Sequence, residues 1–156
     1  MGEPLRTLKS EEVHRDIVTF ALELEDGHGV PPDLEELAHA VIGAAVEVHT
    51  TLGPGLMERV YTIALDHRLK QLGHESAREV EVPLVLFGET VPCAFRADVI
   101  VESRLVVEVK CVEEIHARHK AQLLTYLRLL KLPLGLVINF QGARLKDGGV
   151  RRVINT

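Results

Sequence analysis

The stretch FRADVIVESRLVVEVK, residues 95–110, determines how two strands pair. Runs rich in β-branched residues flank a short polar break, which predicts an antiparallel hairpin with a three-residue loop over residues 102–104. In this register Asp98 lies opposite Glu108, and a slip of one residue would mix apolar with polar side chains on both faces. Arg96 then lies opposite Lys110. We expect a single apolar face, formed by Phe95, Ala97, Val99, Val101, Leu105, Val107 and Val109.

The sequence on the amino-terminal side of this hairpin is helical in pattern. Apolar residues recur at helical spacing, which predicts helices over residues 10–25, 33–50 and 56–72. From Glu79 the period changes to two, and a turn at residues 88–89 precedes the next apolar run. Together with the hairpin, this pattern predicts an antiparallel meander.

The sequence on the carboxyl-terminal side predicts a helix over residues 116–131, a strand over 134–140 and an edge strand over 150–154. The near-continuous apolar run at 134–138 is typical of a strand covered on both faces, and the preceding helix suits a crossover between parallel strands. The expected fold class is therefore α/β, in which N-terminal helices, an antiparallel meander, a crossover helix and further strands build a mixed central sheet.

The chain has 156 residues, of which 46% are hydrophobic and 26% charged, and its net charge is −5. This composition excludes a disordered, collagen-like or wholly coiled-coil protein. No apolar run approaches the ~20 residues of a membrane span, and the N-terminus lacks an apolar signal region, so we expect a cytoplasmic protein without membrane contact. Cys93 and Cys111 match no zinc spacing, and we expect reduced thiols. We divide the chain into an acidic helical extension, residues 1–32, and a domain, residues 33–156.

Positive charge is concentrated in the last quarter of the sequence. Residues 115–156 contain eight Lys and Arg against one acid, Asp147, whereas the rest of the chain is acidic. A local basic patch is sufficient to bind phosphates. A solvated face that offsets the acidic half of the chain explains the same pattern, and charge alone does not separate the two interpretations.

The predicted register brings two carboxylates together, Asp98 and Glu108. Their mutual repulsion is unfavourable without a compensating charge, and oxygen ligands at this spacing suit Mg²⁺ or Mn²⁺. Lys110 points to the same side, where it can stabilise charge on a phosphoryl oxygen. The alternative is a solvent-facing hairpin on which Arg96 and Lys110 neutralise the two acids.

These residues resemble a known family. Asp98 followed by Glu108-Val109-Lys110 is similar to the D…(D/E)xK core of the PD-(D/E)XK nuclease superfamily. Gly55-Leu56-Met57-Glu58-Arg59-Val60-Tyr61 resembles the motif that names the GxxExxY family within it. Further blocks in the matching order lie at residues 42–49, 52–55, 95–98, 121–126 and 136–140.

The resemblance implies a restriction-endonuclease-like core and a divalent metal held by Glu58, Asp98, Glu108 and the main-chain carbonyl of Val109. It also implies catalytic roles for Lys110 and Gln122. We expect substrate contacts from Tyr61, Arg96, Arg118, Lys120 and Tyr126. Because Glu58 and Tyr61 are three residues apart on a helix, we expect them to share a face. His116 and His119 have a zinc-like spacing but no third ligand, so a basic helix face is the favoured interpretation.

The expected function is that of a Mg²⁺- or Mn²⁺-dependent nuclease that hydrolyses phosphodiester bonds in DNA. RNA as the substrate stays open, because no segment recognisably reads bases or the 2′-hydroxyl. The alternative is a non-catalytic module on the same fold that binds nucleic acid or protein. In either case the N-terminal helix is a candidate for self-association into a homo-oligomer.

Overall fold

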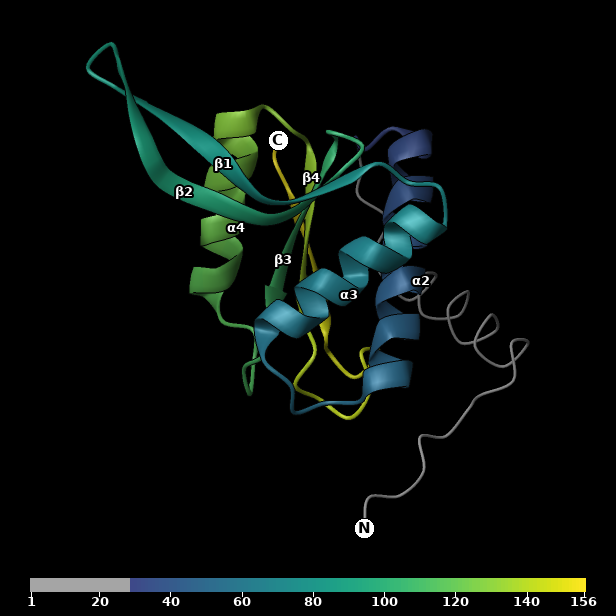
Figure 1. The fold of residues 1–156 in the computed structure, drawn as a ribbon. Helices are drawn as coiled ribbons and strands as arrows, with labels where there is room; N and C mark the ends of the chain where they lie inside the picture. The colour runs from purple at the N-terminus through teal and green to yellow at the C-terminus, as the bar shows by residue number, and fades with distance from the viewer. Residues whose placement is uncertain (1–28) are drawn as a thin grey trace.

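The computed structural model describes residues 29–156 (Figure 1), so the predicted helix over 10–25 lies outside the described residues. The elements are, in chain order, α2 (Pro32–Leu52), α3 (Glu58–Gln71), β1 (Ser76–Leu86), β2 (Glu89–Val101), β3 (Leu105–Lys110), α4 (Ala117–Leu130), β4 (Leu134–Asn139) and β5 (Val150–Ile154). None of the helices within residues 29–156 has the length and apolar character needed to cross a bilayer.

The strands of the described residues form one five-stranded mixed sheet in the order β1-β2-β3-β4-β5. Strands β1, β2 and β3 make an antiparallel meander, and α4 then crosses over so that β4 runs parallel to β3. Strand β5 returns antiparallel to β4. The predicted fold class is confirmed.

The predicted register of the hairpin is confirmed next to the loop, but the ladder does not extend to the expected pairs Asp98–Glu108 and Arg96–Lys110. Val99 pairs with Val107 and Val101 with Leu105, which closes a three-residue loop over residues 102–104. Glu102 and Ser103 adopt left-handed φ values of 50° and 54° in this loop.

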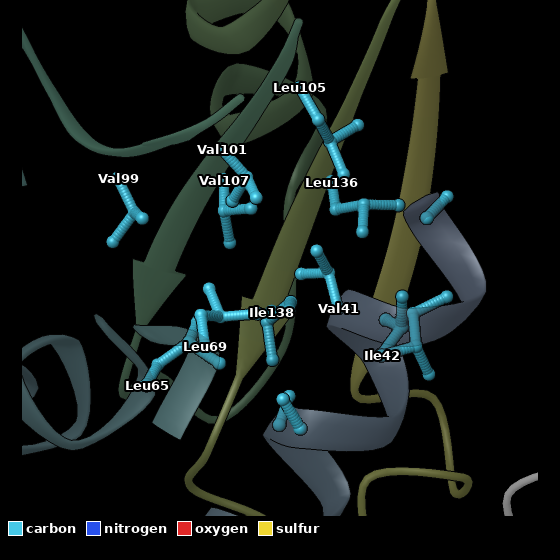
Figure 2. Close-up of a cluster of buried hydrophobic side chains, with 14 of the residues drawn as sticks. Val41, Ile42, Leu65, Leu69, Val99, Val101, Leu105, Val107, Leu136 and Ile138 are labelled. Carbon is cyan, nitrogen blue, oxygen red and sulfur yellow. The ribbon is translucent and has the colours of Figure 1, made fainter. Parts of the chain in front are cut away.

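Helices cover both faces of the sheet. On one face α2 and α3 pack against alternate side chains of β2, β3 and β4, among them Val99, Val107 and Ile138 (Figure 2). On the other face Leu123 and Leu127 of α4 pack against Val106 and Val137. Burial on both sides explains why β3 and β4 have near-continuous apolar sequences.

One prediction about the faces is wrong. Phe95 and Ala97 were expected beside Val99, but both pack in the cluster under α4 on the opposite face. Side chains alternate strictly along a regular strand, so β2 must be irregular near Asp98. The irregularity has a partner in β1, where Glu79, between the paired residues Arg78 and Val80, has a φ of 52°. Regular pairing with β3 ends at Val99, and beyond it β1 and β2 swing away over α4 (Figure 1).

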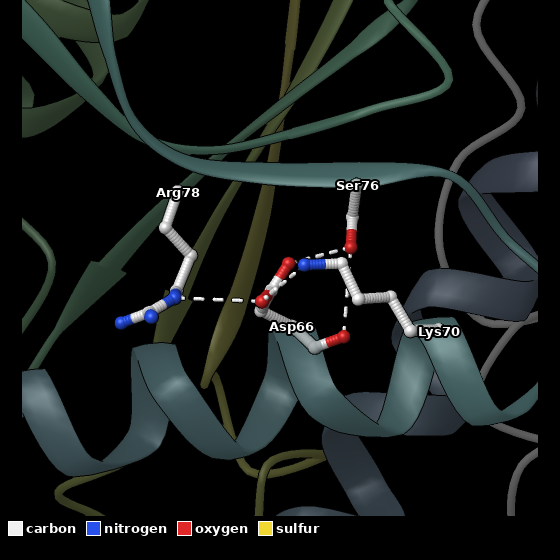
Figure 3. Close-up of polar contacts among 4 residues, drawn as sticks. All are labelled: Asp66, Lys70, Ser76 and Arg78. Atoms are coloured by element: carbon white, nitrogen blue, oxygen red, sulfur yellow. Dashed lines mark hydrogen bonds and ion pairs between the residues drawn. The ribbon is translucent and has the colours of Figure 1, made fainter.

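A polar cluster joins α3 to β1. The buried carboxylate of Asp66 accepts a hydrogen bond from the Ser76 hydroxyl at 2.6 Å and forms ion pairs with Lys70 at 2.9 Å and Arg78 at 3.4 Å (Figure 3). Burial acts to raise the pKa of Asp66, but the Ser76 hydroxyl and the two cations outweigh it and the pKa is lowered. Asp66 is therefore ionised and holds α3 against the meander.

Candidate active site

Asp98 and Glu108 meet between β2 and β3. The backbone N–H of Asp98 donates to Glu108 Oε1 at 3.1 Å, and the backbone N–H of Val109 donates to Asp98 Oδ2 at 2.8 Å. Each carboxylate thus accepts a hydrogen bond from the backbone of the opposite strand. The two acids are therefore close together, as expected, although regular pairing of β2 with β3 has ended at Val99.

The environment of this pair favours the uncharged form of the acids. Glu108 is only 3% exposed, and burial together with the negative charge of Asp98 raises the pKa of Glu108 to about 8. Burial also raises the pKa of Asp98. The pair therefore retains a proton near neutral pH, which a cation of sufficient charge would replace.

Lys110 stands at the carboxyl end of β3, where the strand leaves the sheet. Its positive charge acts on both acids and lowers their pKa values, against the stronger effect of burial. The alternative of a solvent-facing network does not fit, because Glu108 is buried and the described residues place no arginine between the two acids.

Glu58 approaches the same end of β3 from the first turn of α3. Its Oε1 accepts the backbone N–H of Cys111 at 3.2 Å, and its negative charge contributes to the raised pKa of Asp98. Glu58 is exposed, in contrast to the Asp98–Glu108 pair. The structure therefore places Glu58 at the rim near Asp98 and Glu108, but within residues 29–156 the three predicted acids do not converge as one metal-binding group.

Tyr61 does not fit its predicted role in substrate binding. Its side chain is 0% exposed, and its ring stacks on Phe140 with centroids 4.5 Å apart. Its hydroxyl donates to the Gly53 carbonyl and accepts the backbone N–H of Leu56. Positions three apart on a helix differ by about 60° in direction, enough for Tyr61 to enter the core while Glu58 reaches the rim. Tyr61 anchors the loop that leads to Glu58.

Tyr126 of α4 lies near the acids, and Gln122 of the same helix is bonded to it. The side-chain amide of Gln122 donates to the Tyr126 hydroxyl at 3.0 Å, and burial and the negative charge of Glu108 raise the pKa of Tyr126. Tyr126 is only 3% exposed, with its ring edge against Phe95, so Gln122 is the member of the pair that solvent reaches.

The basic residues that were predicted to contact substrate are exposed but do not bond to the acids. All three predicted cations are exposed: Arg96 lies on β2, two residues before Asp98, and Arg118 and Lys120 lie in the first turn of α4. Within residues 29–156 none of the three forms a hydrogen bond with Asp98 or Glu108. The rest of the basic quarter includes structural residues. Arg152 lies in a buried ion pair with Glu35, and Arg144 pairs with Asp147. A single phosphate-facing surface made of all eight basic residues is therefore not formed.

His119 was predicted to lie on a basic helix face and does not. It is buried, and its Nδ1 accepts the backbone N–H of His116 at 3.0 Å, which caps α4. Burial and the nearby charge of Lys110 lower the pKa of His119. In the described part of the chain, no three His, Cys, Asp or Glu side chains converge as a metal-binding group. A zinc site at the two histidines is thus not supported.

The residue that sequence reasoning missed is Asn139 at the end of β4. It is paired in register with Lys110, and its buried amide bonds the chain just after the site. The sequence feature that could have identified Asn139 is its position as a polar residue at the end of the apolar run of β4.

The chain is similar in sequence to one known family. Residues 35–153 match the family model described as the PD-(D/E)XK nuclease superfamily. None of the curated proteins matches the chain. The chain is also similar to a solved structure titled "Crystal structure of SSO0001", with 15% sequence identity and a TM-score of 0.49. The match covers 94% of this chain and 77% of the chain in that structure.

Proposed function

Because the chain belongs to the PD-(D/E)XK nuclease superfamily, and its fold is restriction-endonuclease-like, we propose that it is a metal-dependent nuclease that hydrolyses phosphodiester bonds in DNA. The observation that carries the proposal is the contact between the buried Glu108 and the half-buried Asp98, with Lys110 beside them. A buried glutamate and a half-buried aspartate that share a proton are unfavourable in a purely structural role. They become favourable where a divalent cation takes the place of that proton.

The residues present fit Mg²⁺ or Mn²⁺. These ions commonly take one or two protein carboxylates and complete their shell with water and substrate phosphate, so two acids are sufficient. Asp98 and Glu108 would hold the ion, together with the main-chain carbonyl of Val109. Glu58, at the rim with its carboxylate bonded to the Cys111 N–H, would join them. When bound, such an ion activates water and neutralises charge at phosphorus.

The other side chains act on the substrate directly. Lys110 places a fixed positive charge beside the acids, where a phosphoryl oxygen gains negative charge during hydrolysis. Gln122, backed by the Tyr126 hydroxyl, presents an amide that can orient water or phosphate. The exposed cations Arg96, Arg118 and Lys120 would hold neighbouring phosphates of the strand.

The finer assignments belong to the same proposal. The motif around Gly55, Glu58 and Tyr61 supports membership of the GxxExxY group, and we place the protein in the cytoplasm. Self-association through the N-terminal extension, residues 1–32, is tested by deleting its residues 1–28, which leaves the start of α2 at Pro32 intact, and comparing the molar mass of both forms by light scattering. An unchanged mass rules out this role for the extension.

The test of activity is DNA cleavage by the full chain with Mn²⁺, Mg²⁺ or a chelator. We expect cutting only with a metal, loss of cutting in Glu108→Gln, and full activity in the control Glu114→Gln, which changes an exposed acid in the loop before α4. An RNA substrate run in parallel decides between the two nucleic acids. If the protein binds DNA but cuts neither polymer with any metal, the alternative of a non-catalytic module is correct.

A further inference from the structure

The side chain of Asn139 continues the sheet beyond the end of β3. Its Nδ2 donates to the Val112 carbonyl at 2.8 Å, and its Oδ1 accepts the Val112 N–H at 3.1 Å. The Oδ1 also accepts the N–H of Gln141 at 3.2 Å. Lys110, two residues earlier, is held by the backbone, where its carbonyl accepts the N–H of Phe140 at 2.9 Å.

These bonds require a carboxamide. A donor must face the Val112 carbonyl while an acceptor faces two N–H groups, and of the side chains of this size only asparagine offers both. An aspartate in this place keeps the acceptor but sets a second oxygen against the Val112 carbonyl. The residue is 7% exposed, so water replaces lost partners poorly.

Cys111 connects the bonds of Asn139 to the candidate active site. It lies between the two anchored points, Lys110 and Val112, and its N–H is the group that Glu58 Oε1 accepts at 3.2 Å. The Cys111 N–H lies in the planar peptide that also contains the Lys110 carbonyl, so the Phe140 N–H fixes one side of Cys111 and the Asn139 side chain fixes the other through Val112. The position of the Glu58 carboxylate depends on both anchors.

We propose that Asn139 is a positioning residue of the nuclease site, which sets the Cys111 N–H and through it the Glu58 carboxylate. This inference rests on the proposed function for its effect on metal binding, but not for its effect on Cys111. Partners that orient ligand residues typically contribute 10- to 100-fold to metal affinity.

The experiment compares the full-length chain with Asn139→Ala, Asn139→Asp, Glu58→Ala and the control Val153→Ala. The control removes buried apolar groups of β5, so it lowers stability away from the loop after β3. The first readout is hydrogen exchange of the Cys111 amide by NMR, without metal. The second is the Mn²⁺ concentration that gives half of the maximal thermal stabilisation.

We expect both Asn139 variants to speed exchange at Cys111 at least tenfold more than Val153→Ala does. We expect the Mn²⁺ midpoint to rise about tenfold in them and to stay unchanged in the control. Because Asn139 acts through Glu58, adding Asn139→Asp to Glu58→Ala should raise the midpoint no further.

The outcomes separate this inference from the proposed function. If Asn139→Asp, or Asn139→Ala where it folds, leaves Cys111 exchange at the level of the control, the positioning role is overturned. It is also overturned if the two substitutions raise the midpoint independently. If exchange rises as expected but the unsubstituted protein neither binds Mn²⁺ nor cuts, the role in holding Cys111 stands and the nuclease proposal fails.

Discussion

At the scale of single residues, the Asp98–Glu108 pair determines how stability depends on pH. The pKa of Glu108 is raised from 4.5 to about 8 in the folded protein, so the folded state binds a proton that the unfolded state releases across this range. That contribution is complete below about pH 4.5 and is lost as the pH rises through 8. One pKa unit corresponds to about 1.4 kcal/mol, so the loss amounts to a few kcal/mol at most.

The expected result is that the metal-free protein becomes less stable between pH 5 and 8, and that Glu108→Gln removes most of this slope. Thermal melting or urea unfolding at several pH values measures it. A neutral side chain of the same shape has no proton to lose, so the variant should be the more stable protein at pH 8. Parallel slopes for both proteins would contradict a raised pKa at Glu108.

Lys110 separates metal binding from catalysis. Its charge acts on both acids but is not a ligand, so Lys110→Ala should keep the thermal stabilisation by Mn²⁺ while DNA cleavage falls. Loss of one preorganised group that stabilises developing charge typically costs about 100- to 1,000-fold in rate. Cleavage assays and melting curves on the same preparation give both quantities. Lys146→Ala, which changes an exposed lysine without a role in the site, is the matched control and should reduce cleavage far less.

At the scale of elements, α4 sits on β4 through a close contact at Gly135. A β-carbon added at this residue would lie 2.8 to 3.0 Å from the Cγ and both methyl carbons of Leu123. Gly135→Ala should therefore push α4 away from the sheet and cost about 1–3 kcal/mol. Denaturant unfolding measures this loss.

The partner substitution shows whether the contact is the cause. Leu123→Ala leaves a cavity, and the alanine at 135 fills part of it, so the double variant should lose less stability than the sum of the two single variants. If the losses of the two single variants simply add in the double variant, the contact between residues 135 and 123 is not the cause of the destabilisation.

The Asp66 cluster joins α3, which starts at Glu58, to the strand that pairs with β2. The pKa of Asp66 is lowered from 3.8, so its contribution is present above that value and is lost as the pH falls through the folded pKa. Asp66→Asn should cost about 1–3 kcal/mol at neutral pH and weaken the acid-side fall in stability. Unfolding curves at pH 3 and 7 compare the two proteins. Asp147→Asn, in an exposed pair, should cost far less.

The same scale shows what sequence reasoning could reach. The register of β2 with β3 was predictable because alternation is strict between Val99 and Val107 and a short loop closes it. The change of face at Ala97 was not, since it depends on Glu79 in another strand and on α4 beneath. The burial of Tyr61 was also missed. Helical spacing gives only its angle to Glu58, whereas the Gly53 carbonyl and the Phe140 ring decide where the side chain goes.

At the scale of the whole molecule, metal binding should stabilise the fold. A ligand that binds only the native state at 100 times its dissociation constant adds about 2.7 kcal/mol. For a domain of this size that corresponds to a rise in Tm of about 5–10 °C. We expect Mn²⁺ to give such a rise in the unsubstituted protein and to give little in Glu108→Gln, as scanning calorimetry would show.

Proton release couples this stabilisation to pH. An ion bound by Asp98 and Glu108 must displace the proton that the pair retains, so below about pH 8 its apparent affinity should rise up to tenfold per pH unit. Mn²⁺ therefore stabilises most where the metal-free protein is weakest, and the decline in Tm between pH 5 and 8 should flatten when Mn²⁺ is present. Mn²⁺ titrations followed by melting at pH 6, 7 and 8 measure the effect. A midpoint that stays constant across these values would mean that the ion binds without displacing the proton, and hence away from the two acids.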